Sequence, residues 1–233
     1  MALDAYYDEV YKNEQIVLGD FPPRFPRNRF EALASICPSG RRVLEIGAGS
    51  GSVLYNIRDK FEELYGLEFS PVRCGKMEEA FGRRNINCRC LAGSIENTLD
   101  FTEGFFDAII WADVIEHVVD LWKAMEEIRR LLAAGGVLIT ITPNVAAIRR
   151  RLELLMGNFP ATSGAREGLD VRDGELFDGG HVHYFTFSSL EGLYRRYGIE
   201  PTARFGFGRL GRVHNLYPSL LSGGACVAGR KKN

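Results

Sequence analysis

Short apolar runs alternate with amphipathic stretches along most of the chain. Continuous apolar runs at 106–112 and 137–142 are typical of strands buried on both faces of a sheet. Shorter runs at 42–46, 64–67 and 86–92 predict three further strands. Helical spacing and capping residues predict helices over 26–37, 52–60, 71–83, 120–135, 146–156 and 186–197. Strands that alternate with helices predict parallel βαβ units in a doubly wound α/β sheet.

The two ends of the chain and one internal stretch depart from this alternation. Segment 1–40, with a short helix expected at 4–13, is predicted to form a helical N-terminal lid, in which Tyr6 and Tyr7 cover a ligand or pack on the sheet. The irregular stretch 144–184 is predicted to be a cap insert over the substrate, because such segments in compact domains are usually functional. Two last strands are expected at 201–208 and 225–229. We expect residues 1–233 to form one domain.

Charge and composition narrow the class of protein. The formal net charge of −1 gives no long-range attraction to nucleic acid or to an anionic membrane. No apolar run approaches the roughly 20 residues of a membrane span, and the N-terminal stretch is acidic where a signal peptide is basic. The five cysteines include no C-x-x-C pair, and Cys88 and Cys90 are predicted to be buried free thiols on one face of a strand. A cytoplasmic protein is expected.

A glycine-rich turn, VLEIGAGSG, follows the first predicted strand and leads into a helix. Gly47, Gly49 and Gly51 allow the backbone to turn sharply and to approach a ligand closely. Nicotinamide dehydrogenases use a similar turn, with the spacing G-x-G-x-x-G that this chain lacks. Glu45 would repel a pyrophosphate and attract an ammonium or sulfonium cation. The turn therefore favours a cationic nucleoside over a dinucleotide.

Glu68 lies at the end of the second predicted strand, about 20 residues after the glycine turn. A carboxylate at this place can accept hydrogen bonds from both hydroxyls of a ribose. We interpret Glu68 as a ribose ligand rather than as a solvated acid at the end of a strand.

Four segments of the chain resemble class I S-adenosylmethionine (SAM)-dependent methyltransferases: VLEIGAGSG, LYGLEFS, FDAIIWADVIEHVVD and LLAAGGVLITITPN. The resemblance is strongest to the bacterial type-11 and type-12 groups and to the ubiquinone-biosynthesis O-methyltransferases. It covers about residues 42–144, with weaker similarity in HVHYFTFSSLEGLYRRYGI. It implies a Rossmann-like, doubly wound, mostly parallel seven-stranded sheet with an antiparallel last strand. It also implies a set of SAM-binding residues: Glu45, Gly47, Ala48, Gly49, Glu68, Phe69, Ser94, Ile95 and Asp113.

Catalytic candidates follow the fourth predicted strand, at the edge where open α/β sheets bind ligands. A hydroxyl acceptor must lose its proton during methyl transfer. His117 is the best base, because an imidazole titrates near neutral pH, and its neighbour Glu116 is a second candidate. His181 and His183 share a face if their segment is extended, and they are further catalytic candidates, with a structural role as the alternative.

Metal binding is a second interpretation of the same residues. Some of the resembling enzymes that carry an acid-x-x-Glu-His motif hold Mg²⁺, and Asp113, Glu116 and His117 would be the ligands here. His181 or His183 could complete such a set. Because Mg²⁺ prefers oxygen ligands, the histidines favour a softer or mixed site. In a third interpretation Glu116 and His117 only cap the following turn.

The sequence therefore predicts a SAM-dependent methyltransferase that acts on a small molecule, with a hydroxyl as the favoured acceptor. SAM is the expected cofactor, with Mg²⁺ as the alternative addition, and the protein is expected to be a monomer or homodimer. N-methylation, methylation of an RNA 2′-hydroxyl, and a catalytically silent SAM-binding partner of another enzyme are the alternatives. The near-zero net charge argues against RNA.

Overall fold

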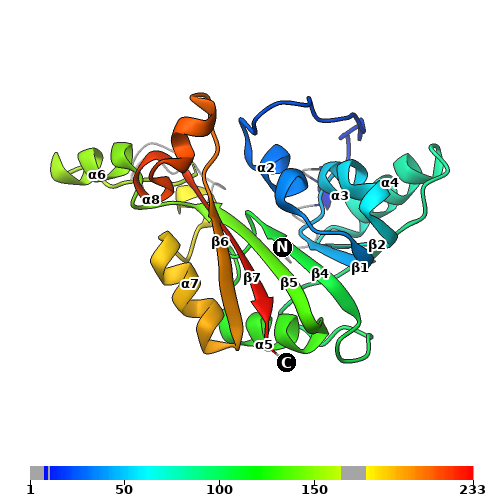
Figure 1. The fold of residues 1–233 in the computed structure, drawn as a ribbon. Coiled ribbons are helices and arrows are strands. Elements are labelled where there is room, and N and C mark those ends of the chain that lie inside the picture. Colours follow the sequence, from blue (N-terminus) through cyan, green and yellow to red (C-terminus); the bar gives the residue numbers. More distant parts are fainter. Residues whose placement is uncertain (1–7, 10, 164–176, 233) are drawn as a thin grey trace.

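The computed structural model describes residues 8–9, 11–163 and 177–232 (Figure 1). Three parts of the sequence predictions lie outside these residues. They are Tyr6 and Tyr7, half of the predicted helix 4–13, and residues 164–176 of the predicted cap insert.

A seven-stranded sheet forms the centre of the structure, in the order β3-β2-β1-β4-β5-β7-β6. Strand β7 runs antiparallel to its neighbours β5 and β6, and the other pairs are parallel. The predicted Rossmann-like sheet with an antiparallel last strand is thus confirmed. The strands are β1 (Gly40–Ile46), β2 (Phe61–Glu68), β3 (Cys88–Ala92), β4 (Phe106–Ala112), β5 (Leu132–Pro143), β6 (Ile199–Phe205) and β7 (Gly224–Lys231).

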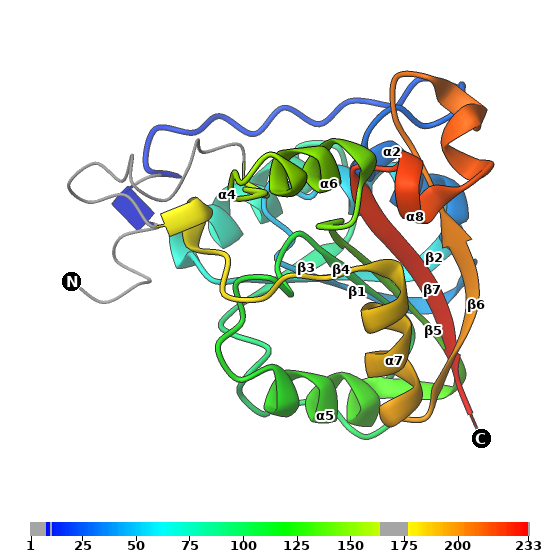
Figure 2. The same ribbon diagram turned by 90° about the vertical axis from the view of Figure 1, so that its left-hand side faces the viewer.

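Helices cover both faces of the sheet (Figure 2). One face packs against α2 (Arg29–Ile36), α3 (Ser52–Ile57) and α4 (Pro71–Gly82). The opposite face packs against α5 (Leu121–Leu131) and α7 (Phe187–Arg196). The helices α6 (Ile148–Leu155) and α8 (Pro218–Leu221) contribute no buried residue to either layer, and α6 follows the end of β5.

Two apolar cores result, one on each face of the sheet. Neighbouring residues of β4 point to opposite faces, because side chains alternate along a strand. Trp111 therefore joins Met125 and Tyr194 in one core, whereas Ile110 joins Leu54 in the other. Each large apolar side chain that is fully buried contributes about 1.5–3 kcal/mol. The two cores hold the carboxyl ends of the parallel strands in fixed positions.

The starts of the helices are set by capping side chains. Asp120 caps α5 by accepting a hydrogen bond from the backbone N–H of Lys123 at 3.1 Å, as the sequence predicts. Ser70 caps α4 in the same way, and Thr186 and Ser189 form a reciprocal capping box at α7. These caps satisfy N–H groups that a helix leaves without a partner.

Strand β5 starts earlier than predicted. The sequence predicts that the preceding helix continues to residue 135, but α5 ends at Leu131 and β5 begins at Leu132. Leu132 pairs with Phe106 of β4, and the register shifts before the regular pairing resumes at Ala108. Pairing with the neighbouring strand β4 sets this boundary. The local sequence pattern carries no information about that pairing.

Cys90 forms a disulfide, contrary to the prediction that it is a free thiol, whereas Cys88 is free and buried as predicted. Cys74 of α4 and Cys90 of β3 are bonded, with their Cα atoms 5.4 Å apart. The two residues meet because α4 packs directly against β3 after a short connection. Cys37, Cys88 and Cys226 are free and buried.

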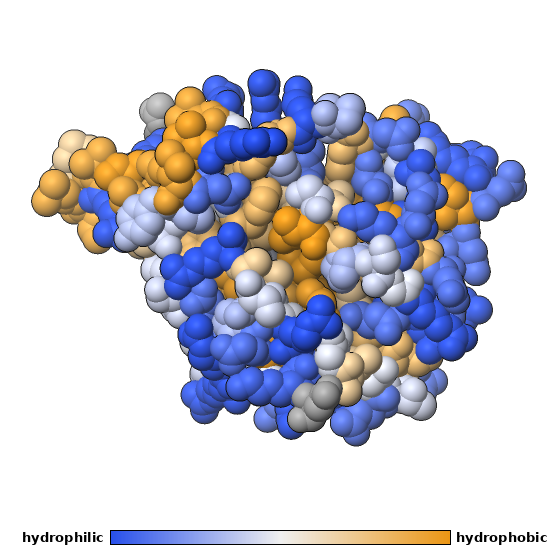
Figure 3. Space-filling model, in the orientation of Figure 1, coloured by the Kyte–Doolittle hydropathy of each residue, from blue (hydrophilic) through white to orange (hydrophobic). Residues whose placement is uncertain are grey.

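Apolar side chains are exposed on α6, at the upper left of Figure 3. Leu154, Leu155 and Met156 are 63%, 81% and 68% exposed. None of the helices in the described part of the chain is both long enough and apolar enough to cross a membrane.

Candidate active site

The glycine-rich turn joins β1 to α3 and is fixed to the end of β2. The backbone N–H groups of Gly47 and Ala48 donate to the carbonyl of Leu67 at 2.8 and 3.0 Å. Gly47 has a left-handed φ of +69°, which favours glycine. A Cβ at Gly47 would also lie 2.2 Å from Cγ2 of Val114. Both the backbone conformation and the available space therefore require glycine at this position.

A cavity of about 450 Å³ opens beside the turn, at the carboxyl ends of β1, β2, β3 and β4. This is the edge at which open α/β sheets bind ligands, and the volume is typical of small-molecule sites. The cavity lining contains His117 and all residues that the sequence assigns to the cofactor: Glu45, Gly47, Ala48, Gly49, Glu68, Phe69, Ser94, Ile95 and Asp113.

Glu45 is a buried carboxylate in the wall of this cavity. Its side chain is 3% exposed, and its Oε2 has no hydrogen-bond partner among the residues that the structure describes. Burial, and to a smaller extent the charge of Glu68, raises the pKa of Glu45 to about 8. A backbone hydrogen bond with Leu54 lowers the pKa but does not outweigh burial, so ionising this buried carboxyl group costs free energy. A cation bound in the cavity would offset that cost.

Glu68 is held in a fixed position by two backbone groups. Its Oε2 accepts a hydrogen bond from the N–H of Gly49 at 2.8 Å, and its Oε1 accepts one from Ser70 at 3.2 Å. Each carboxylate oxygen has a second lone pair. Glu68 can therefore accept further hydrogen bonds from a ligand in the cavity.

The loop after β3 contributes two polar side chains to the cavity. Ser94 donates a hydrogen bond from Oγ to Oε2 of Glu96 at 3.2 Å, and it accepts one from the backbone N–H of Glu96. The other oxygen of Glu96 accepts a hydrogen bond from the N–H of Asp120 at 2.5 Å. Glu96 thus brings a carboxylate to the place where the sequence analysis identified only Ser94.

Asp113 turns the chain directly after β4, with a left-handed φ of +51°. Its carboxylate forms an ion pair with Arg29 of α2, and both residues line the cavity. Burial raises the pKa of Asp113 to about 6, although the positive charge of Arg29 opposes this rise. Asp113 is therefore engaged by Arg29, a residue that the sequence analysis did not identify.

Glu116 lies behind the cavity and is not part of its lining. Its side chain is 1% exposed, and its Oε2 accepts a hydrogen bond from the hydroxyl of Thr142 at 3.1 Å. Burial, and next the charge of Asp113, raises the pKa of Glu116 to about 8. The backbone carbonyl of Glu116 accepts hydrogen bonds from Val182 and His183, so this turn also positions the histidine segment.

His117 lines the cavity and is half-buried. Its Nδ1 lies 3.3 Å from the carbonyl oxygen of Gly180. Because a carbonyl can only accept a hydrogen bond, the proton of the neutral ring is on Nδ1 and Nε2 has a free lone pair. Burial lowers the pKa of His117, which favours the neutral ring. The geometry and the charge state both suit a base.

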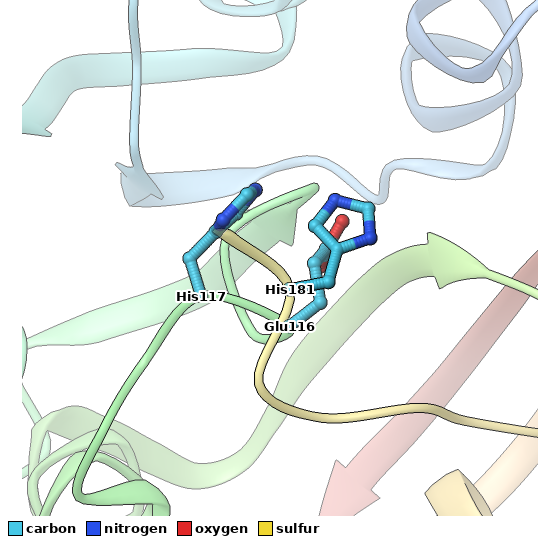
Figure 4. A group of neighbouring side chains, drawn as sticks. All are labelled: Glu116, His117 and His181. Carbon is cyan, nitrogen blue, oxygen red and sulfur yellow. The ribbon is translucent and has the colours of Figure 1, made fainter. Parts of the chain in front are cut away.

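The two histidines of the predicted pair, His181 and His183, lie in different surroundings, and Figure 4 shows His181 next to His117 and Glu116. The ring of His181 packs edge-on against that of His117, with the ring centres 4.6 Å apart, and ligand atoms of Glu116, His117 and His181 all lie within 4.8 Å of one another. His183 is not part of this group. Its ring centre lies 6.2 Å from that of Phe185, and its buried Nε2 has no hydrogen-bond partner among the described residues.

A comparison with known families identifies the kind of enzyme. A family model described as a methyltransferase domain matches residues 20–203, which is more than half of the chain. The chain belongs to this methyltransferase family. SAM is the methyl donor of the family, so the protein is a SAM-dependent methyltransferase.

Several curated proteins resemble this methyltransferase over part of its length. It is 30% identical over 115 residues to a "probable S-adenosylmethionine-dependent methyltransferase" of Mycolicibacterium smegmatis, which covers 49% of this chain and 42% of the relative. It is 29% identical over 141 residues to the highly reducing polyketide synthase ctvA of Aspergillus terreus, covering 57% of this chain and 5% of the synthase. The chain thus spans less than half of the length of these relatives.

Solved structures share the fold of the methyltransferase at low sequence identity. The [4+2]-cyclase SpnF superimposes with a TM-score of 0.66 and 15% identity, covering 99% of this chain and 95% of the cyclase. The YcgJ protein of Bacillus subtilis gives a TM-score of 0.62 and 14% identity, covering 88% of this chain and 98% of that protein. Because one of these proteins is described as a cyclase, the fold alone does not define the reaction.

Three charged residues of the cavity lining were missed by the sequence analysis. Arg29 and Arg73 line the cavity, as does Glu96. None of the three belongs to a motif around the glycine turn or the fourth strand. Only Glu96, two residues after Ser94, could have been suspected, as a carboxylate near the expected adenine.

Proposed function

We propose that this methyltransferase binds SAM in the cavity at the ends of β1 to β4 and methylates a hydroxyl group of a small molecule. The observation that carries the proposal is the position of His117. Its neutral ring lines the same cavity as Glu45 and Glu68 and has an unprotonated Nε2. A base and a site for a cationic nucleoside therefore share one space.

For the cofactor, we assign the carboxylates of the cavity to the polar parts of SAM. Glu45, buried and without a hydrogen-bond partner on Oε2 among the described residues, would offset the positive charge of the methionine part. Glu68 would accept hydrogen bonds from the ribose hydroxyls through its remaining lone pairs. Ser94 and Ile95 would flank the adenine, and we add Glu96 as an acceptor for its amino group. Asp113 would lie beside the methyl group.

A hydroxyl acceptor is favoured because it needs a base. Methyl transfer is an in-line displacement in which orientation supplies about 7–11 kcal/mol of the barrier. A hydroxyl must also lose its proton, and general-base catalysis contributes about 100-fold to 10,000-fold. His117 is suited to take that proton. The resemblance to ubiquinone-biosynthesis O-methyltransferases supports the same acceptor class.

Loss of the base tests the proposal. With SAM as donor and a panel of phenols and catechols as acceptors, His117→Ala should lower kcat at least 100-fold, the lower end of the range for a general base. The dissociation constant of S-adenosylhomocysteine should stay within about twofold. His214→Asn is the matched control, because His214 lies outside the cavity and bonds to the carbonyl of Leu221. Full turnover of a hydroxyl acceptor by His117→Ala would refute the assignment, and turnover of amines alone would favour N-methylation.

Metal-assisted methylation is a second candidate. It is favoured by one observation, the grouping of Glu116, His117 and His181 within 4.8 Å. One oxygen and two nitrogens suit Zn²⁺ or another transition metal better than Mg²⁺, which prefers oxygen ligands. A metal bound there would lower the pKa of an acceptor hydroxyl. Metal analysis of the purified protein and assays with EDTA separate the two candidates. Activity that survives EDTA supports the base, whereas loss with recovery on adding Zn²⁺ supports the metal.

A further inference from the structure

Asp178, three residues before His181, is hydrogen-bonded to Thr162 and Ser163. Its Oδ1 accepts hydrogen bonds from the N–H and the hydroxyl of Ser163, at 2.8 and 2.7 Å. Its Oδ2 accepts hydrogen bonds from the N–H and the hydroxyl of Thr162, at 2.9 and 2.8 Å. Tyr184 donates a further hydrogen bond to Oδ2 at 3.2 Å. We call this arrangement of Asp178 with Thr162 and Ser163 the Asp178 clamp.

The clamp is centred on a buried carboxylate. Asp178 is 3% exposed and has a left-handed φ of +42°, which is uncommon for aspartate and is held here by its contacts. Burial alone would raise its pKa, but the hydrogen bonds from Ser163 and Thr162 outweigh burial and lower the pKa to about 2. Asp178 is thus an ionised carboxylate, which can only accept hydrogen bonds.

This charge state fixes the direction of the hydrogen bonds that lead to His181. The hydroxyl of Thr162 has one proton, which it donates to Asp178. Nδ1 of His181 lies 2.6 Å from the same hydroxyl oxygen, which can then only accept. Nδ1 of His181 must therefore carry the ring proton, and Nε2 of the neutral ring is unprotonated.

His117 depends on the same loop. The carbonyl that accepts the hydrogen bond from its Nδ1 belongs to Gly180, two residues after Asp178. The clamp sets the position of that carbonyl, because Asp178 ties the start of this short turn to Thr162 and Ser163. Arg150 helps to hold Thr162 in place by donating to the carbonyls of Ala161 and Thr162, at 3.3 and 3.4 Å.

We infer that Asp178 is a positioning residue, which acts through Thr162 and the carbonyl of Gly180 to hold both His181 and His117 with the proton on Nδ1. Each neutral ring then has an unprotonated Nε2, and the two rings lie next to Glu116 (Figure 4). For its effect on catalysis, this inference rests on the proposed function. The tautomers themselves do not depend on it.

Nitrogen-15 NMR of the histidine rings tests the inference without acceptor or cofactor. At pH 8 the wild-type protein should show His117 and His181 with protonated Nδ1, assigned by the loss of each signal in His117→Ala and His181→Ala. Thr162→Val, which removes the hydroxyl, should shift His181 to the tautomer with protonated Nε2. Thr162→Ser should retain the wild-type tautomer. A wild-type His181 with protonated Nε2, or a Thr162→Val protein with an unchanged His181, would overturn the inference.

Kinetics with an active phenol or catechol then separate the inference from the proposed function. Thr162→Val should lower kcat about tenfold to a hundredfold, as typical of removing the partner that orients a histidine, with little change in KM for SAM. Thr162→Ser should recover most of the activity. If the tautomers respond as expected but no hydroxyl compound is methylated, the inference about Asp178 is supported and the proposed function is wrong. If methylation depends on His117 but the tautomers do not change in Thr162→Val, the inference about Asp178 is wrong and the proposed function is retained.

Discussion

The carboxylate of Glu68 accepts a hydrogen bond from the backbone N–H of Gly49 at 2.8 Å. This contact ties the end of β2 to the glycine turn that follows β1, and it buries Glu68 to 6% exposure. A single side chain thus stabilises the turn and presents charged oxygens to the cavity. Substitutions of Glu68 should affect both the order of the turn and the affinity for the cofactor.

Glu68→Ala should raise the dissociation constant of S-adenosylhomocysteine about tenfold to a hundredfold, because one or two charge-assisted hydrogen bonds are lost. Glu68→Gln should have a smaller effect, since its amide oxygen can still accept from Gly49. Isothermal titration calorimetry measures both. An affinity of Glu68→Ala equal to that of the wild type would exclude Glu68 from the binding site.

Glu45→Gln should stabilise the protein without ligand and weaken SAM binding. The pKa of Glu45 is raised from its ordinary value of 4.5 to about 8, so between these values the folded state binds a proton that the unfolded state has released. The free energy of unfolding of the wild type therefore falls as pH rises through this window. Relative to wild type, the free energy of unfolding of Glu45→Gln should rise by less than about 1 kcal/mol near pH 5 and by about 4 kcal/mol near pH 8.

Urea denaturation at several pH values measures this difference. Glu126→Gln is the control, because Glu126 is exposed on α5 and lies outside the cavity. A stability difference between Glu45→Gln and wild type that does not grow with pH would contradict the assigned pKa. Unchanged SAM affinity would contradict the role of Glu45 in balancing a cation.

Gly47→Ala should destabilise the protein by about 1–3 kcal/mol, because the new methyl meets Val114 and the backbone has a left-handed φ. Adding Val114→Ala should relieve the steric part and leave the backbone strain. Gly75→Ala is the matched control, since Gly75 lies inside α4 with nothing near its absent Cβ. Denaturation curves compare the variants. Equal stability of Gly47→Ala and Gly75→Ala would show that the turn tolerates a side chain.

The strands and the glycine turn were predictable because their signals are local. The apolar runs of β4 and β5 and the VLEIGAGSG turn each specify an element within a few residues. The start of β5 was not predictable, because Leu132 is extended only by pairing with Phe106. The disulfide between Cys74 and Cys90 likewise depends on how α4 lies on β3.

The residues of the candidate site also differ in whether a local sequence signal predicts them. Residues predicted at strand ends, such as Glu45 and Asp113, line one cavity because parallel strands end at one edge of the sheet. Arg29 comes from a helix without any motif and reaches Asp113 only through the packing of α2. Arg150 of α6 likewise donates to the carbonyls of Asn144 and Gly223, contacts that depend on the folded chain and not on a local pattern.

Titration of the wild-type protein with SAM, S-adenosylhomocysteine and NAD⁺ in a calorimeter tests the central claim most directly. The buried Glu45 and the proposed ribose ligand Glu68, both beside the glycine turn, should select the cationic nucleoside and its demethylated product. We expect each to bind with one molecule per chain, and NAD⁺ not to bind. Binding of NAD⁺, or the absence of binding by both SAM and S-adenosylhomocysteine, would contradict the account.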